Sequence, residues 1–91
     1  MTIKEKQEEM TSRVKQKLDE VNYRIFDINS FFSEDNLLRD LTRQSVIITR
    51  FTETTLQNSL YLITDFETLE MLYVQTGPTS FVDIDVFFSR E

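Results

Sequence analysis

Carboxylates are the side chains of this sequence that come closest, in type and spacing, to a set of catalytic residues, because the chain contains no His, no Cys and no Trp. Two suitably placed carboxylates can act as general acid and general base. Asp83 and Asp85 lie two residues apart in a segment with strand periodicity, which places them on one face. Glu67 and Glu70 are one helical turn apart, and Asp65 lies just before them. Nothing around these residues predicts a pocket that would perturb their pKa values, so we expect solvated carboxylates, no catalytic residue and no enzymatic activity.

The same acidic residues are the candidate metal ligands. Asp83 and Asp85, together with Glu91, offer the hard oxygen atoms that Mg²⁺ and Ca²⁺ prefer. Their spacing is not that of an EF-hand, and the loop glycine of that motif is missing. A chain with a single Gly also has no glycine-rich phosphate-binding loop. The sequence therefore predicts no metal site and no cofactor.

Charge and hydropathy limit the partners and the compartment. The net charge is −6, and residues 46–91 carry two Lys or Arg against seven Asp or Glu. Nucleic-acid binding depends on Lys and Arg contacts to phosphate, so we expect no direct nucleic-acid ligand. No apolar run is long enough to cross a membrane, and the N-terminus lacks the apolar run of a signal peptide. Because the lack of Cys also fits a reducing compartment, we expect a cytoplasmic protein without membrane contact.

The distribution of Gly and Pro predicts the elements that position these side chains. Neither residue occurs before Gly77-Pro78. Both break regular backbone, so a stretch of this length without them favours long helices. From residue 10 to residue 32, apolar side chains recur every three or four positions, the period of one helix face, which predicts a helix over 3–31. This stripe consists of Met10, Val14, Leu18, Val21, Ile25, Ile28 and Phe32.

A second helical region is predicted over 34–75, with an uncertain middle. Ser33 is a suitable N-cap for its start, and Phe31-Phe32 would form a corner packed on the helical core. Residues 45–63 are rich in β-branched side chains, which suit strands. Helix is preferred there because a tight hairpin would need an Asn-Gly or Asp-Gly turn, and none is present.

The end of the helical region is predicted from two local signals. Thr64 and Glu67 have the spacing of a capping box before an apolar run. Gly77 is expected in the left-handed position that ends a helix, with Pro78 preventing its continuation. Beyond Pro78 the apolar period changes to two, which predicts a strand over 79–88.

These elements make a single small domain, residues 1–91, of the mainly α class. The preferred architecture is an antiparallel helical hairpin or small bundle with a C-terminal β-strand. The alternative is an α+β fold in which one long helix packs on a small antiparallel sheet. The strands of that sheet would be 45–51, 58–64, 69–75 and 80–88.

Assembly and function follow from the thin core and the long apolar stripes. A chain of this size covers such stripes poorly by itself, so we expect a homo-oligomer, most simply a dimer with coiled-coil packing. Gln44, Asn58 and Asp65 would set its register. The function predicted is a non-enzymatic protein–protein interaction module, such as an adaptor, a small chaperone or an assembly factor. The candidate partner-binding residues are Phe81, Val82, Ile84, Val86, Phe87 and Phe88.

A different class of function remains open beside it. The acidic half of the chain could imitate a row of phosphates to a basic groove. The alternative is therefore an acidic, phage-type inhibitor that blocks a nucleic-acid-binding or defence protein.

Overall fold

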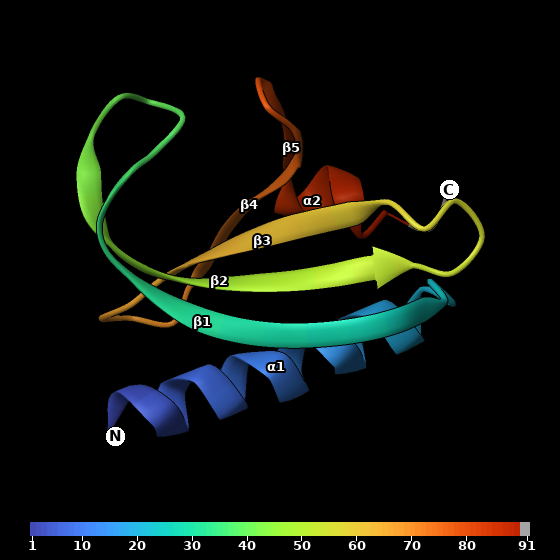
Figure 1. The fold of residues 1–91 in the computed structure, drawn as a ribbon, viewed down its shortest axis with the longest axis horizontal. Helices are drawn as coiled ribbons and strands as arrows, with labels where there is room; N and C mark the ends of the chain where they lie inside the picture. Colours follow the sequence, from blue (N-terminus) through green and yellow to red (C-terminus); the bar gives the residue numbers. More distant parts are fainter. Residues whose placement is uncertain (90–91) are drawn as a thin grey trace.

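One N-terminal helix packs against a twisted antiparallel sheet of five strands, and the strands follow one another in chain order (Figure 1). The structure is a computed structural model that describes residues 1–89. Each strand pairs with the next along the chain, so β1 and β5 are the two edges of the sheet. The elements are α1 (Ile3–Glu20), β1 (Ile25–Leu37), β2 (Arg43–Glu53), β3 (Ser59–Asp65), β4 (Met71–Gly77), β5 (Ser80–Asp83) and α2 (Ile84–Phe87).

The predicted mainly α class is therefore wrong, and so is the coiled-coil packing. Helices account for 25% of the described residues and strands for 47%, whereas the preferred architecture needed helix over most of residues 3–75. The α+β alternative describes the architecture, one helix on a small antiparallel sheet. It misses β1, because residues 25–31 were assigned to the long helix.

The helix α1 begins as its sequence suggests and ends eleven residues earlier than predicted. Thr2 accepts a hydrogen bond from the backbone N–H of Glu5, whose carboxylate accepts one from Thr2, so the start is a capping box. At the other end Asn22 adopts the left-handed conformation, with φ 59°. The backbone N–H of Tyr23 then donates to the carbonyl of Leu18 at 2.8 Å, which closes the last turn.

The apolar stripe runs past this helix end because two periods coincide. Ile28 and Phe32 are four residues apart, which keeps them on one face of a helix and equally on one face of a strand. A β-bulge between Ile25 and Asp27 shifts the register by one residue. Ile25 therefore packs against the same core as Ile28, although their odd spacing is atypical of a regular strand.

The turns between strands use carboxylates and left-handed non-Gly residues in place of glycine. Leu41, Gln57 and Leu69 have φ of 68°, 56° and 62°. In the β2–β3 turn, Glu53 accepts hydrogen bonds from the following backbone N–H groups. In the β3–β4 turn, Asp65 does the same. Side-chain acceptors of this kind stabilise turns without an Asn-Gly pair, so the helical assignment of 34–75, including its Thr64–Glu67 capping box, is wrong.

Gly77 and Pro78 lie in a tight hairpin between β4 and β5. Gly77 is opposite Ser80 in the sheet and its φ is not positive, so it is not the predicted left-handed end of a helix. The strand predicted over 79–88 is present only as Ser80–Asp83. Residues Ile84–Phe87 form the short helix α2.

The two faces of the sheet carry separate apolar clusters. On the face that α1 covers, the cluster is centred on Met10, Val14 and Leu18 of the helix and on Phe51 of β2, all fully buried. On the opposite face a smaller cluster consists of Leu38, Val46, Ile63 and Tyr73. This alternation along β2 and β3 is the period-2 pattern of a sheet with both faces in use.

The opposite face is partly closed by the tip of the β1–β2 hairpin, which curls away from α1 (Figure 1). The backbone N–H of Arg39 in this tip donates to the Tyr73 hydroxyl at 3.2 Å, and the guanidinium lies 4.7 Å from the centre of the Tyr73 ring. The same guanidinium forms an ion pair with Asp83 of β5 at 2.6 Å. The tip thus contacts β4 and β5 and covers part of this face.

Candidate functional site

The acidic pair predicted near the C-terminus is split between two elements. Asp83 is the last residue of β5 and its carboxylate is used in the ion pair with Arg39. Asp85 lies exposed in the first turn of α2. The two residues therefore do not share the face of one strand, and they do not line a common pocket.

The second acidic group organises a turn. Asp65 accepts hydrogen bonds from the backbone N–H groups of Thr68 and Glu67 and from the Gln44 amide. These bonds, first of all the one from Thr68, lower the pKa of Asp65 below its ordinary value. Glu67 and Glu70 are exposed in the same turn. A carboxylate held ionised by its own turn is a structural group, and it lacks the raised pKa that suits a general acid.

No metal centre is assembled by the described residues. Within residues 1–89, no three acidic side chains come together in a way that could hold an ion. Glu91, the third suggested ligand, lies outside the described residues. Likewise, no helix in the part of the chain that the structure describes has the length and apolarity needed to cross a bilayer.

The six candidate partner-binding residues are distributed over both faces of the sheet. Phe81 packs edge-to-face on Tyr73 at 5.4 Å between ring centres, on the face opposite α1. Ile84, Phe87 and Phe88 pack against the cluster beneath α1. Val82 is half-buried opposite Val74, and Val86 is 64% exposed. These residues therefore do not form one continuous surface, and their role in partner binding stays a prediction.

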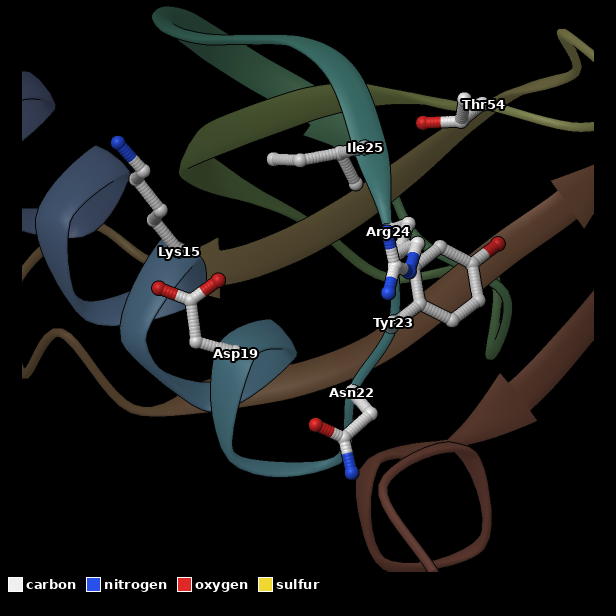
Figure 2. Close-up of a pocket in the computed structure, with 7 residues that line it drawn as sticks. All are labelled: Lys15, Asp19, Asn22, Tyr23, Arg24, Ile25 and Thr54. Atoms are coloured by element: carbon white, nitrogen blue, oxygen red, sulfur yellow. The ribbon is translucent and has the colours of Figure 1, made fainter.

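A hollow of about 530 Å³ lies where α1 ends and β1 begins (Figure 2). The hollow is lined by Lys15 and Asp19 of α1 and by Arg24, just before β1. Their charged ends lie apart in Figure 2, and none of them forms an ion pair with another within the described residues. Tyr23 also lines the hollow, and burial and then the charge of Glu53 raise the pKa of its hydroxyl. Charged groups that do not converge cannot grip a small ion or a substrate, so this hollow has no catalytic geometry.

The surface with the strongest features of a binding site is the uncovered part of the sheet face opposite α1. A hollow of about 340 Å³ lies between the curled β1–β2 hairpin and the central strands. Three of its side chains are unusually exposed for their type: Leu37 at 51%, Phe31 at 39% and Tyr61 at 36%. We call this surface the open face. It is lined by Phe31, Asn36, Leu37, Ile48, Tyr61, Ile63 and Gln75.

The charges beside the open face are arranged as Arg–Asp pairs. Arg50 lies 3.2 Å from Asp27, and Arg39 pairs with Asp83 as described above. A looser pair at 3.9 Å joins Arg43 to Asp35. All three pairs are substantially exposed, so each contributes little to stability. Their effect is to leave an apolar centre with a polar, nearly neutral rim.

Sequence reasoning missed this site because it assigned Phe31 to a buried corner between helices. In the structure Phe31 faces outward from β1, between Ser30 and Phe32 on the α1 side. One signal was available: residues 28–33 alternate only weakly, with two adjacent Phe, as in a strand that has an apolar residue on each face.

Comparisons of the chain with models of protein families, with curated proteins and with solved structures find no match.

Proposed function

We propose that this chain is a non-enzymatic protein-binding module whose open face holds an apolar segment of a partner protein. The observation that carries the proposal is the exposure of Phe31, Leu37 and Tyr61 around a single hollow. Adjacent exposed aromatic and aliphatic side chains with a polar rim are typical of interaction sites. An adaptor, a small chaperone or an assembly factor would use such a surface.

The shape of the hollow favours side chains of a peptide over a cofactor. At about 340 Å³ it is near the lower end of the range for small-molecule sites, about 300–1,000 Å³. It is open to solvent along the sheet, so one or two apolar side chains can enter while the peptide backbone stays outside. Phe31 and Tyr61 are aromatic, the residue class that is enriched at the energetic centres of interfaces.

The charge of the molecule favours a partner segment with Lys or Arg beside its apolar residues. The arginines around the open face are each paired with an aspartate, so no unpaired cation of the described residues is available there to attract an acidic partner. The chain as a whole carries −6, which accelerates the approach of a basic segment and slows that of an acidic one.

The acidic inhibitor stays a second proposal with less support. It needs a row of free carboxylates in the acidic half of the chain, but Asp83 is paired with Arg39, and Glu53 and Asp65 accept the hydrogen bonds of their own turns. We place either role in the cytoplasm, since the chain contains no Cys that would need an oxidising compartment.

The test is a selection of binders from a displayed library of random twelve-residue peptides. We expect enriched peptides to combine Phe, Leu, Ile or Tyr with Lys or Arg. Binding of a synthetic copy of one such peptide is then measured against Phe31→Ser and Leu37→Ser. Each substitution removes an exposed apolar anchor and should weaken binding by about tenfold or more, the loss of at least 1.4 kcal/mol that marks an interface hot spot.

The matched control is Leu56→Ser. Leu56 is 70% exposed but lies in the β2–β3 turn, away from the open face, so its loss should leave peptide affinity unchanged. Equal effects of the Leu37 and Leu56 substitutions, or no enriched peptide at all, would contradict the proposal. Affinity that falls steeply with salt and ignores Phe31→Ser would favour the acidic inhibitor instead.

A further inference from the structure

β1 leaves a long edge of the sheet without a partner in the described chain. The opposite edge, β5, has four residues, whereas β1 has thirteen. An edge strand presents unpaired N–H and C=O groups that can pair with another strand. Bulges interrupt the β1–β2 pairing between Ile25 and Asp27 and between Ser33 and Asn36. Between them lies a regular stretch, Asp27–Ser33, with no Pro, Lys or Arg to oppose pairing.

The charges on the flank of α1 beside this edge are the second observation. Lys4 and Glu8 border an open hollow of about 360 Å³ whose lining residues all belong to α1 and β1. Lys15 and Asp19 border the next hollow along the same flank, beside the start of β1 (Figure 2). All four are exposed, and none forms an ion pair within residues 1–89. Their order along the helix is positive, negative, positive, negative.

We propose that a second copy of this chain pairs with the β1 edge, which gives a two-fold symmetric dimer with one continuous ten-stranded sheet. The axis passes beside Ser30, the middle of the regular stretch. It is perpendicular to the sheet, because antiparallel strands that share a sheet face are related in that way. Both copies of α1 then lie on the same side of the joined sheet, next to each other and antiparallel.

The helix pairing and the strand pairing have the same centre, which is why a second copy fits better than an unrelated strand. Thr11, midway between the charges of α1, donates a hydrogen bond to the Ser30 hydroxyl at 2.7 Å. A two-fold axis there places Lys4 opposite the partner's Asp19, and Glu8 opposite the partner's Lys15. Each of these juxtapositions joins opposite charges, so the flank is complementary to itself.

The strand register that follows is also compatible. With Ser30 opposite its own copy, Ile28 faces the partner's Phe32, a β-branched and aromatic pair of the kind that stabilises sheets. Moving the axis by one residue in either direction, to Asn29 or to Phe31, would leave fewer residues of the regular stretch Asp27–Ser33 able to pair, because Ser30 is its centre. The regular stretch and the charge pattern thus select one register.

The dimer would bring the open faces of its two copies together, although the proposed dimer does not rest on the proposed function of the open face. In this register Phe31 lies opposite the partner's Asn29, so the two open faces would join across the axis into one surface. Substitutions on the flank of α1, on the other side of the sheet, do not change the open face itself. Loss of dimerisation and loss of peptide binding can therefore be told apart.

Charge reversal tests the proposal. Sedimentation equilibrium over two decades of protein concentration should show a species of twice the 10.9 kDa of one chain. Glu8→Lys and Lys15→Glu each convert both copies of one attraction into repulsion, so each should weaken dimerisation by about tenfold. The double variant restores opposite charges across the axis and should regain most of the affinity. Glu20→Lys, an equal charge change at the exposed end of α1, is the control and should have no effect.

Hydrogen exchange provides the readout for the strand. Amides within residues 27–33 should become protected as the protein concentration rises, because half of them gain a partner across the axis. Thermal unfolding of the same variants at low concentration verifies that they fold. A monomer at every concentration would overturn the proposal. So would a dimer that ignores both single reversals, or one whose new protection lies outside β1.

Discussion

Removal of the Phe87 ring is the most direct test of how the end of the chain packs. Phe87 lies in α2, and its ring centre is 5.5 Å from that of Tyr23, 6.0 Å from that of Phe51 and 5.1 Å from that of Phe88. Phe51 is fully buried at the centre of the main cluster. A ring in this position extends the main core, although it is itself only partly covered.

The expected cost of Phe87→Ala follows from these contacts. A fully buried Phe→Ala change costs about 3–5 kcal/mol of unfolding free energy. Phe87 keeps some exposure, so part of this cost is absent, and we expect about 2–3 kcal/mol. In a domain of this size about 1 kcal/mol shifts the melting temperature by roughly 4–8 °C, which predicts a decrease of about 8–24 °C.

Urea unfolding followed by circular dichroism measures this difference, and Val86→Ala is the matched control in the same helix. Val86 is 64% exposed, so its truncation should change the unfolding free energy by no more than about 0.5 kcal/mol. If Phe87→Ala is as stable as Val86→Ala, α2 is not docked on the core. Phe87 would then be available to a partner, as the sequence alone suggested.

Four further predictions address the sheet and its turns. Thr64→Val should raise the unfolding free energy by about 1 kcal/mol, because Thr64 Oγ1 is buried without a hydrogen-bond partner in the described residues. Thr49→Val removes a 2.8 Å hydrogen bond to Ser30 and should lower the unfolding free energy by about 1 kcal/mol. The pKa of Asp65 is lowered in the folded state, so its contribution to stability is present above the ordinary Asp pKa of 3.8 and is lost as the pH falls through the folded-state value. Acid unfolding should therefore be shallower for Asp65→Asn than for the natural chain, and parallel curves would show that the turn bonds do not matter. Gly77→Ala should be neutral or stabilising by up to about 0.5 kcal/mol, since an added Cβ would meet Ser80 at an ordinary 3.6 Å; a loss above about 1 kcal/mol would mean that Gly77 needs a conformation only glycine adopts. Leu38→Ala should lower the free energy of unfolding by about 2–3 kcal/mol in thermal unfolding, because Leu38 is 7% exposed and belongs to the second cluster. Leu41→Ala, at the 80% exposed tip of the hairpin, should lower the same free energy by less than about 0.5 kcal/mol.

Local signals in the sequence were sufficient for the start and the buried face of α1. The predicted change from helix to strand at Gly77-Pro78 is wrong, because the pair joins two strands, β4 and β5. The helix stripe of Met10, Val14 and Leu18 is buried against the sheet as a 3.6-residue period requires. The α+β alternative, with strands near 45–51, 58–64 and 69–75, lies close to β2, β3 and β4. The β-branched content of these segments was therefore a better guide than the missing Asn-Gly turns, since Glu53 and Asp65 supply the turn acceptors.

The end of α1 and the identity of β1 depended on contacts that are distant in sequence. Asn22 can end a helix in the left-handed conformation, but it can also continue one, so the residue alone does not decide. Ile28 and Phe32 fit a helix and a strand equally well, because four positions return to the same face in both. What favours the strand is β2, whose residues 46–52 pair with 27–33 in register.

The composition determined the net charge of −6, the lack of His and Cys, and hence the narrow range of chemistry open to this chain. Tertiary structure alone decided which apolar side chains remain outside the core. Phe31 and Phe32 are identical neighbours, yet the pleat of β1 directs Phe32 toward Phe66, 4.7 Å away, and leaves Phe31 on the open face. Which of the two rings is buried depends on the side of the sheet that α1 covers. Such a long-range packing relation is not encoded in the spacing of the residues themselves.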